Sequence, residues 1–136
     1  MSEPEINLRV TPFLMFPEQA ESAIRFYTGL FPDSKIELID RYLGGDGGPA
    51  GTVRLAQISL HGQRLMCIDS PVKHAFGFTP AISLYVSSDD PVAIEHYFHA
   101  LAEGGTILMP LGEYPFSRKF GWVNDRFGVS WQLSAT

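Results

Sequence analysis

Cysteine is almost absent from this chain of 136 residues, in which Cys67 is the single example. One thiol cannot close a disulfide within the chain, so the fold cannot depend on internal cross-links. A chain of this length with 45% hydrophobic residues buries enough apolar surface to fold without them. This composition suits a reducing compartment, and we expect the protein to be cytoplasmic.

Clusters of basic residues and long apolar runs are also lacking. Fifteen acidic side chains oppose ten Lys and Arg, the formal net charge is −5, and the basic residues are scattered. Nucleic acid is therefore not an expected partner, because phosphate backbones bind to clustered positive charge. No long apolar run follows the acidic start of the sequence, so we expect neither a signal peptide nor a membrane span.

The spacing of apolar residues predicts the same order of elements twice. Apolar residues recur every three or four positions in two segments and alternate with other residues in eight shorter ones. The predicted helices are 17–31 and 91–103, and the predicted strands are 9–16, 35–42, 52–61, 63–70, 81–87, 106–111, 118–124 and 129–135. Each half therefore has the layout βαβββ, and one helix cannot cover both faces of its sheet.

Turn and capping residues separate these elements. The glycine-rich stretch 44–51 predicts a mobile loop, which could act as a lid. His61-Gly62 predicts a hairpin turn. Asp90 is suited to cap the second helix, with Pro91 at its first position.

Several stretches resemble a known protein family. They are Thr11-Pro12-Phe13-Leu14, 20–27 and 30–34 in the first half, and 81–86 and 121–133 in the second. They resemble the 3-demethylubiquinone-9 3-methyltransferase-like (PhnB-like) branch of the glyoxalase/bleomycin-resistance/dioxygenase superfamily, also called vicinal oxygen chelate. The resemblance implies one α+β domain over 1–136, with βαβββ modules at about 8–70 and 80–135. The modules would form a cupped mixed sheet with the helices outside, which binds a small molecule, and the protein would be a homodimer. Whether the modules pair within one chain or across a dimer stays open.

Catalytic members of the superfamily hold a divalent metal, commonly through His and Glu side chains. The resemblance places the four ligand positions at Pro12 or Thr11, at Met66 or Ile68, at Ala81 and at Gln132. One weak oxygen donor among four does not make a metal site, so we expect no metal and no cofactor. His96 and His99, beside Glu95, could hold zinc on the second helix, but a solvated helix surface is the simpler interpretation.

Strand alternation predicts which residues line the helix-free face of the sheet. They are Leu14, Gln57, Ser59, Met66, Ile68, Ser83, Tyr85, Ser130 and Gln132. Apolar walls with a few amides and hydroxyls are typical of a small-molecule pocket. The alternative is that these polar groups satisfy one another in a solvated sheet. Trp122, Trp131 and Cys67 are expected to pack against the helices.

These expectations favour a metal-free small-molecule-binding protein of the glyoxalase/bleomycin-resistance type with an unknown ligand. One alternative is an enzyme, either a metal-dependent lyase or oxygenase of the same superfamily or a metal-free one that uses Tyr85 or Gln132. Another is a dimeric protein-interaction module. Methyl transfer is not expected, because the glycine-rich turn of a doubly wound methyl-donor domain is not visible in the sequence.

Overall fold

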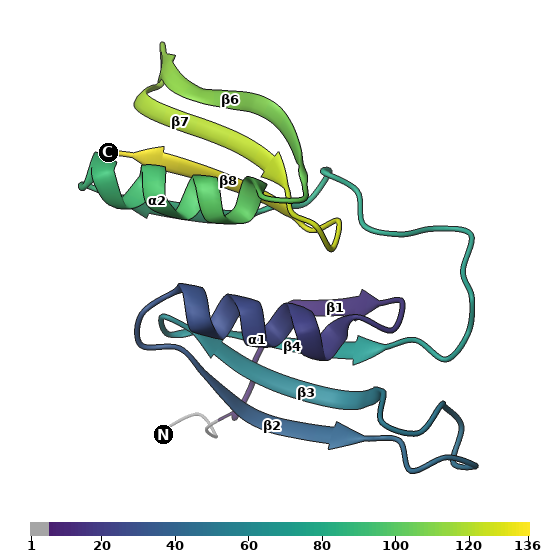
Figure 1. Cartoon of the computed structure of the whole chain (residues 1–136). Helices are drawn as coiled ribbons and strands as arrows, with labels where there is room; N and C mark the ends of the chain where they lie inside the picture. Colours follow the sequence, from purple (N-terminus) through teal and green to yellow (C-terminus); the bar gives the residue numbers. More distant parts are fainter. Residues whose placement is uncertain (1–5) are drawn as a thin grey trace. The chain divides into compact units, whose positions relative to one another are not determined.

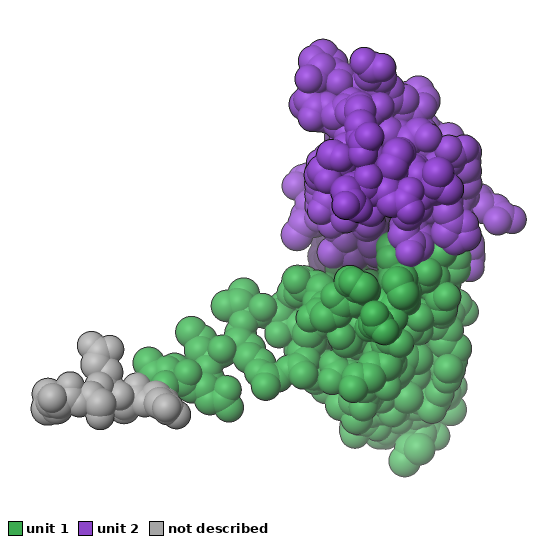
Figure 2. Space-filling model, turned by 90° about the vertical axis from the view of Figure 1, so that its left-hand side faces the viewer, with its two compact units in different colours: residues 1–73 green, residues 74–136 purple. Residues whose placement is uncertain are grey.

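The structure, a computed structural model, describes residues 6–136. The chain divides into two compact units, Met1–Lys73 and His74–Thr136, here called unit 1 and unit 2 (Figure 2). Each unit contains one helix and one four-stranded sheet. Within the described residues, neither helix is long and apolar enough to cross a membrane.

Both units have the predicted βαβββ order, and the α+β class is confirmed (Figure 1). Unit 1 contains β1 (Phe13–Phe16), α1 (Ala20–Leu30), β2 (Lys35–Arg41), β3 (Val53–Leu60) and β4 (Gln63–Asp69). Unit 2 contains β5 (Leu84–Ser88), α2 (Pro91–Ala102), β6 (Thr106–Tyr114), β7 (Ser117–Asn124) and β8 (Ser130–Ala135). The strand orders are β1-β4-β3-β2 and β5-β8-β7-β6, and the first pair of each sheet is parallel. The two units therefore share one topology although their sequences differ.

In unit 1, α1 packs against the face of the sheet that alternation predicted to be buried. Ala56 and Ile58 of β3 and Leu65 and Cys67 of β4 are fully buried. Burial raises the pKa of the Cys67 thiol to about 12. The thiolate is therefore scarce near neutral pH, in keeping with a structural rather than a reactive cysteine.

The first helix begins later than predicted. Glu18 has a φ of 64°, which no α-helix contains, so Pro17 lies in the turn before α1 instead of its first position. The buried carboxylate of Asp69, at the end of β4, accepts hydrogen bonds from Ala20 N and Val53 N, each at 2.8 Å. A residue 49 positions away thus caps α1, which local sequence signals cannot show.

In unit 2, α2 begins as predicted. Asp90 Oδ1 accepts a hydrogen bond from Val92 N at 2.9 Å, and Pro91 is the first helical residue. The helix lies close to the sheet because Phe98 covers Gly121. A Cβ atom at Gly121 would lie 2.4 Å from Phe98 Cε2, so a side chain there would collide with the ring.

The turn between β7 and β8 is tied to the core by Asp125, which is 3% exposed. Its Oδ1 accepts from Phe127 N at 2.8 Å and from Val129 N at 3.0 Å. Its Oδ2 accepts from Trp131 Nε1 at 2.9 Å, and Trp131 is buried on the α2 side as predicted. This carboxylate fixes the start of β8 and therefore the register of its side chains.

One expected result concerns acid stability in unit 1. Arg41 of β2 donates to both Glu21 oxygens, and Arg25 donates to Oε2, so α1 is linked to the edge strand. The hydrogen bond from Arg41 is the largest cause that lowers the pKa of the Glu21 carboxyl from 4.5 to about 2. A lowered folded-state pKa stabilises the fold above pH 4.5, and this contribution is lost as the pH falls toward 2.

Glu21→Gln should therefore reduce the free energy of unfolding at pH 7 by at most about 1 kcal/mol, because the pair is partly solvated. Urea unfolding at pH 7, 4 and 2 measures this free energy. The difference from the wild type should shrink as the pH approaches 2. Glu113→Gln, which removes an exposed carboxylate of β6, is the control. A difference that stays constant between pH 7 and 2 would contradict the ion-pair explanation.

Candidate functional site

The face of each sheet that its own helix does not cover is called the open face here. In unit 2, one row of side chains crosses this face from strand to strand. Met109 pairs with Trp122, Trp122 with Gln132, and Gln132 with Tyr85. Neighbouring strands lie about 4.8 Å apart, so this row, named row 2, extends over roughly 14 Å. Tyr85 is 58% exposed, so its ring is accessible on the outer strand.

Hydrogen bonds join the polar side chains of this face into one network. Trp122 Nε1 donates to Ser130 Oγ at 2.9 Å, and the Oγ atoms of Ser130 and Ser83 are 2.7 Å apart. Gln132 Nε2 donates to Ser83 Oγ at 3.2 Å. Ser130 is 2% exposed, whereas Ser83 is only partly buried. The network therefore leads from a buried hydroxyl to one that a bound molecule could reach.

The surroundings of row 2 are uncharged. The neighbouring paired positions on the same face are Thr106, Asn124 and Ser130 on one side and Gly112, Phe120, Ser134 and Ser87 on the other. Asn124 Oδ1 is buried without a hydrogen-bond partner among the described residues. A buried polar atom without a partner costs about 1–3 kcal/mol, which a bound water or ligand could relieve.

Unit 1 has a corresponding row, named row 1. Leu38 pairs with Gln57, Gln57 with Met66, and Met66 with Phe13. Phe13, on the outer strand, is 54% exposed, as the corresponding Tyr85 is in unit 2. Row 1 thus also combines one glutamine amide with apolar groups and an accessible aromatic ring.

A charged pair borders row 1. Ser59 lies opposite Arg64 in the register, and Arg64 Nε is 3.3 Å from Glu37 Oε1. The open face of unit 1 is therefore more polar at this end than the middle of the open face of unit 2.

Most of the predicted lining residues lie on the open faces. Gln57, Ser59, Met66 and Ile68 do so in unit 1, and Ser83, Tyr85, Ser130 and Gln132 do so in unit 2. The network brings Ser83, Ser130 and Gln132 into direct contact.

Two predicted orientations are wrong. Leu14 pairs with the buried Cys67 and therefore lies on the α1 side, since partners in a parallel pair share a face. Phe13 and Met15 occupy the open face of β1 instead, because they pair with Met66 and Ile68 of β4. Trp122 pairs with Gln132, so it lies on the open face and not against α2. Its position follows from the register of β7, which apolar character alone does not reveal.

A family model described as 3-demethylubiquinone-9 3-methyltransferase matches residues 8–134. The chain belongs to this family. A structure from Bacillus cereus, described as a putative 3-demethylubiquinone-9 3-methyltransferase, PhnB protein, is 55% identical, with 93% of this chain and 98% of that chain covered and a TM-score of 0.91. Protein PA1353 from Pseudomonas aeruginosa is 29% identical, with 94% and 97% covered and a TM-score of 0.80.

More distant structures show the fold of the superfamily. A glyoxylase/bleomycin resistance protein/dioxygenase domain from Frankia is 17% identical, with 98% of each chain covered and a TM-score of 0.63. The predicted glyoxalase/bleomycin-resistance fold is therefore confirmed. None of the curated proteins compared with the chain matches it.

The open-face side chains of this family member do not fit a divalent metal. The positions that the resemblance assigned to ligands carry a thioether, an apolar side chain, alanine, proline or threonine, and the amide of Gln132. Zinc, manganese and magnesium take imidazole, thiolate or carboxylate ligands, and one neutral amide does not replace them. Among residues 6–136, no three His, Cys, Asp or Glu side chains gather as a metal site.

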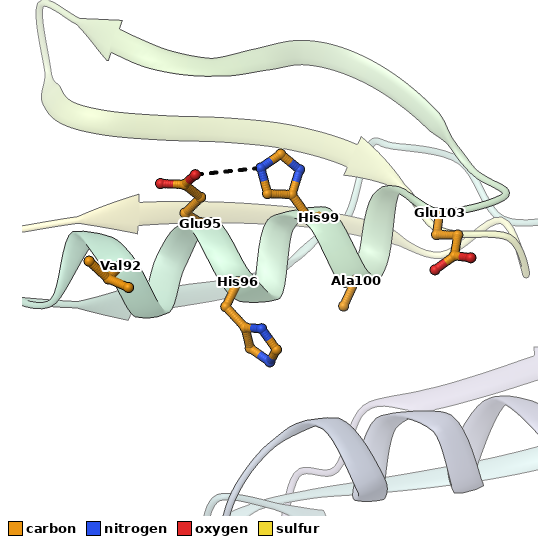
Figure 3. Close-up of a pocket in the computed structure, with 6 residues that line it drawn as sticks. All are labelled: Val92, Glu95, His96, His99, Ala100 and Glu103. Atoms are coloured by element: carbon orange, nitrogen blue, oxygen red, sulfur yellow. Dashed lines mark ion pairs between the residues drawn. The ribbon is translucent and has the colours of Figure 1, made fainter.

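The two histidines of α2 do not form a metal-binding pair. They line a shallow hollow on the outer surface of the helix, together with Val92, Glu95, Ala100 and Glu103 (Figure 3). His99 Nε2 is 3.8 Å from Glu95 Oε1, whereas His96 points away from this pair (Figure 3). Lys119 Nζ is 2.8 Å from Glu95 Oε2 and lowers the pKa of that carboxyl. Glu95 therefore joins His99 and Lys119 in a surface ion-pair network.

Proposed function

We propose that this protein binds an uncharged, flat, largely apolar molecule on the open face of unit 2, without a metal ion. Row 2 carries the proposal, because Trp122, Gln132 and Tyr85 present two aromatic side chains with an amide between them. Aromatic side chains supply contact area for a flat ligand, and a few fixed polar groups set its orientation.

The open face of unit 1 offers a second, similar surface. Leu38, Met66 and Phe13 supply apolar contacts there, and Gln57 supplies an amide. Ile68 and Ser59 extend this surface. We rank it second because the Arg64–Glu37 pair lies beside it and would disfavour an apolar molecule at that end.

Binding is favoured over the methyl transfer in the family's description. A methyl donor such as S-adenosylmethionine is commonly held at a glycine-rich turn in a doubly wound parallel sheet. Both sheets here are mixed, and each is covered by one helix. The family's description therefore contributes its fold to the proposal and not its reaction.

The two tryptophans allow a direct test, because they lie on opposite faces of one sheet. Each indole N–H gives its own signal in a ¹⁵N–¹H spectrum. We expect titration with indane or 1-indanone to shift the Trp122 signal and to leave the Trp131 signal in place. The Trp131 signal is the internal control, since its N–H is bound to the buried Asp125. If the titration reaches saturation and the Trp122 signal has not moved, the proposed site is refuted.

A second test concerns metals. Equimolar Mn²⁺ should leave the Trp122 signal unbroadened, and millimolar Zn²⁺ or Mn²⁺ should not raise the melting temperature. A metal that binds the folded state stabilises it by RT ln(1 + [L]/Kd) and so raises the melting temperature. A clear rise in melting temperature together with broadening of the Trp122 signal would contradict the proposal. Gln132→Glu is the matched variant, because a carboxylate at this position supplies one ligand that metals prefer.

We also propose that the protein is a cytoplasmic homodimer. Large apolar side chains outside both rows, such as Leu43, Val72 and Ile82, are 62–85% exposed in the single chain, and burial of such groups stabilises dimers. Light scattering across a range of protein concentrations measures the assembly state.

A further inference from the structure

The hydrogen-bond network behind row 2 has a direction, because one of its ends can only donate. The indole N–H of Trp122 has no acceptor atom, and it donates to Ser130 Oγ. Ser130 and Ser83 share a second hydrogen bond, in which either hydroxyl could be the donor. The burial of the two serines decides between these directions.

Two hydroxyl protons are present, and the bond between the serines uses only one. If Ser83 donated to Ser130, the proton of Ser130 would have to find another acceptor at a position that is 2% exposed. The nearest paired residue on this face, Asn124, has an Oδ1 that accepts no hydrogen bond from any described residue, Ser130 included. An unsatisfied buried hydroxyl is unfavourable, so Ser130 donates to Ser83.

This direction leaves the proton of Ser83 for a bound molecule. Ser83 Oγ then accepts from both Ser130 and Gln132, which uses its two lone pairs. Its own O–H has no acceptor among the described residues, and Ser83 is only partly buried. The accessible end of the network, the O–H of Ser83, therefore donates.

We infer that the Trp122–Ser130–Ser83 relay presents a hydrogen-bond donor to the ligand and selects uncharged molecules that carry an acceptor, such as a ketone or amide carbonyl. This inference rests on the proposed function, since it names the chemical class that the same face recognises. An anion is disfavoured because the paired positions around the network carry no positive charge. A ligand that carries only hydrogen-bond donors is also disfavoured, because it would place a donor against the donor end of the relay.

Three fused-ring probes of similar size separate these cases. Indane has no polar group, 1-indanone has only an acceptor, and indole has only a donor. We expect 1-indanone to bind roughly three- to tenfold more tightly than indane or indole, the effect of one neutral hydrogen bond. The dissociation constants come from the Trp122 signal in the NMR titration.

Ser83→Ala should abolish the preference for 1-indanone and leave the affinity for indane unchanged. Ser87→Ala is the matched control, because Ser87 of β5 lies four residues after Ser83 on the same face of the sheet and is exposed. Rescue by Ser83→Thr, which restores a hydroxyl, would support a direct hydrogen bond over a change of shape.

Failure of the inference is distinguishable from failure of the proposed function. Equal binding of the three probes, a preference for indole, or an equal loss for all probes in Ser83→Ala would overturn the donor relay while binding on this face stands. If none of the probes shifts the Trp122 signal, both proposals fall. A melting temperature within a few degrees of the wild type confirms that each variant is folded.

Discussion

Asp125→Ala should lower the free energy of unfolding by about 3–5 kcal/mol, the largest stability effect that we expect from one substitution. The alanine removes acceptors from two backbone N–H groups and from the indole of Trp131. These donors lie in or next to the buried start of β8, where water cannot easily replace the carboxylate. Urea unfolding followed by tryptophan fluorescence measures the loss.

Two further substitutions separate the contacts of Asp125. Asp125→Asn keeps one oxygen acceptor and places an NH₂ group toward a donor, so an intermediate loss is expected. Asp89→Ala, an exposed aspartate of the same unit, should change the stability by less than about 0.5 kcal/mol. If Asp125→Ala lowered the free energy of unfolding no more than Asp89→Ala does, the Asp125 carboxylate would not hold the β7–β8 turn.

The order of elements was predictable from sequence because it depends on local patterns. Alternation identified the buried face of β3 and β4, and Asp90-Pro91 identified the start of α2. The start of α1 was not predictable, because its cap is Asp69, which the pairing of β4 with β1 places beside the helix. Contacts of this range carry no local signal in a single sequence.

The residues of the candidate site were predictable where the strand register could be predicted from the sequence. Gln132, Tyr85 and Ser130 follow from the alternation of β5 and β8, both short and regular. Leu14 was assigned to the wrong face because its side depends on how β1 pairs with β4, and a shift of one residue reverses every side chain. The network through Trp122 was missed because large aromatic residues occur on both the covered and the open face of this sheet.

The two rows show how one topology can support different surfaces. Gln57 of row 1 is the structural equivalent of Trp122 in row 2, and Met66 is the equivalent of Gln132. The order of amide and large apolar side chain is thus reversed between the units. Among residues 6–136, the amide bonds to a serine pair only in unit 2, so in this part of the chain it is that sheet which presents a directed donor.

Trp122→Ala should weaken the binding of 1-indanone by roughly 10- to 100-fold, the largest effect on binding that we expect. The substitution removes the widest contact surface of row 2 and also the fixed donor of the relay. Trp122→Phe keeps an aromatic ring but not the N–H, so a smaller loss is expected, with a reduced preference for 1-indanone over indane. Because the Trp122 signal is lost in both variants, calorimetry replaces the NMR titration.

Phe116→Ala is the matched control for Trp122→Ala. Phe116 is an aromatic residue that is 64% exposed, and it stacks on Tyr114 near the β6–β7 turn, outside row 2. Its removal should leave the affinity for 1-indanone within about twofold of the wild type, because the ring is not part of the proposed contact surface. Equal losses in the two variants would mean that binding depends on general apolar exposure. Unchanged binding in Trp122→Ala would remove the open face of unit 2 as the site, because Trp122 is the central aromatic contact of row 2.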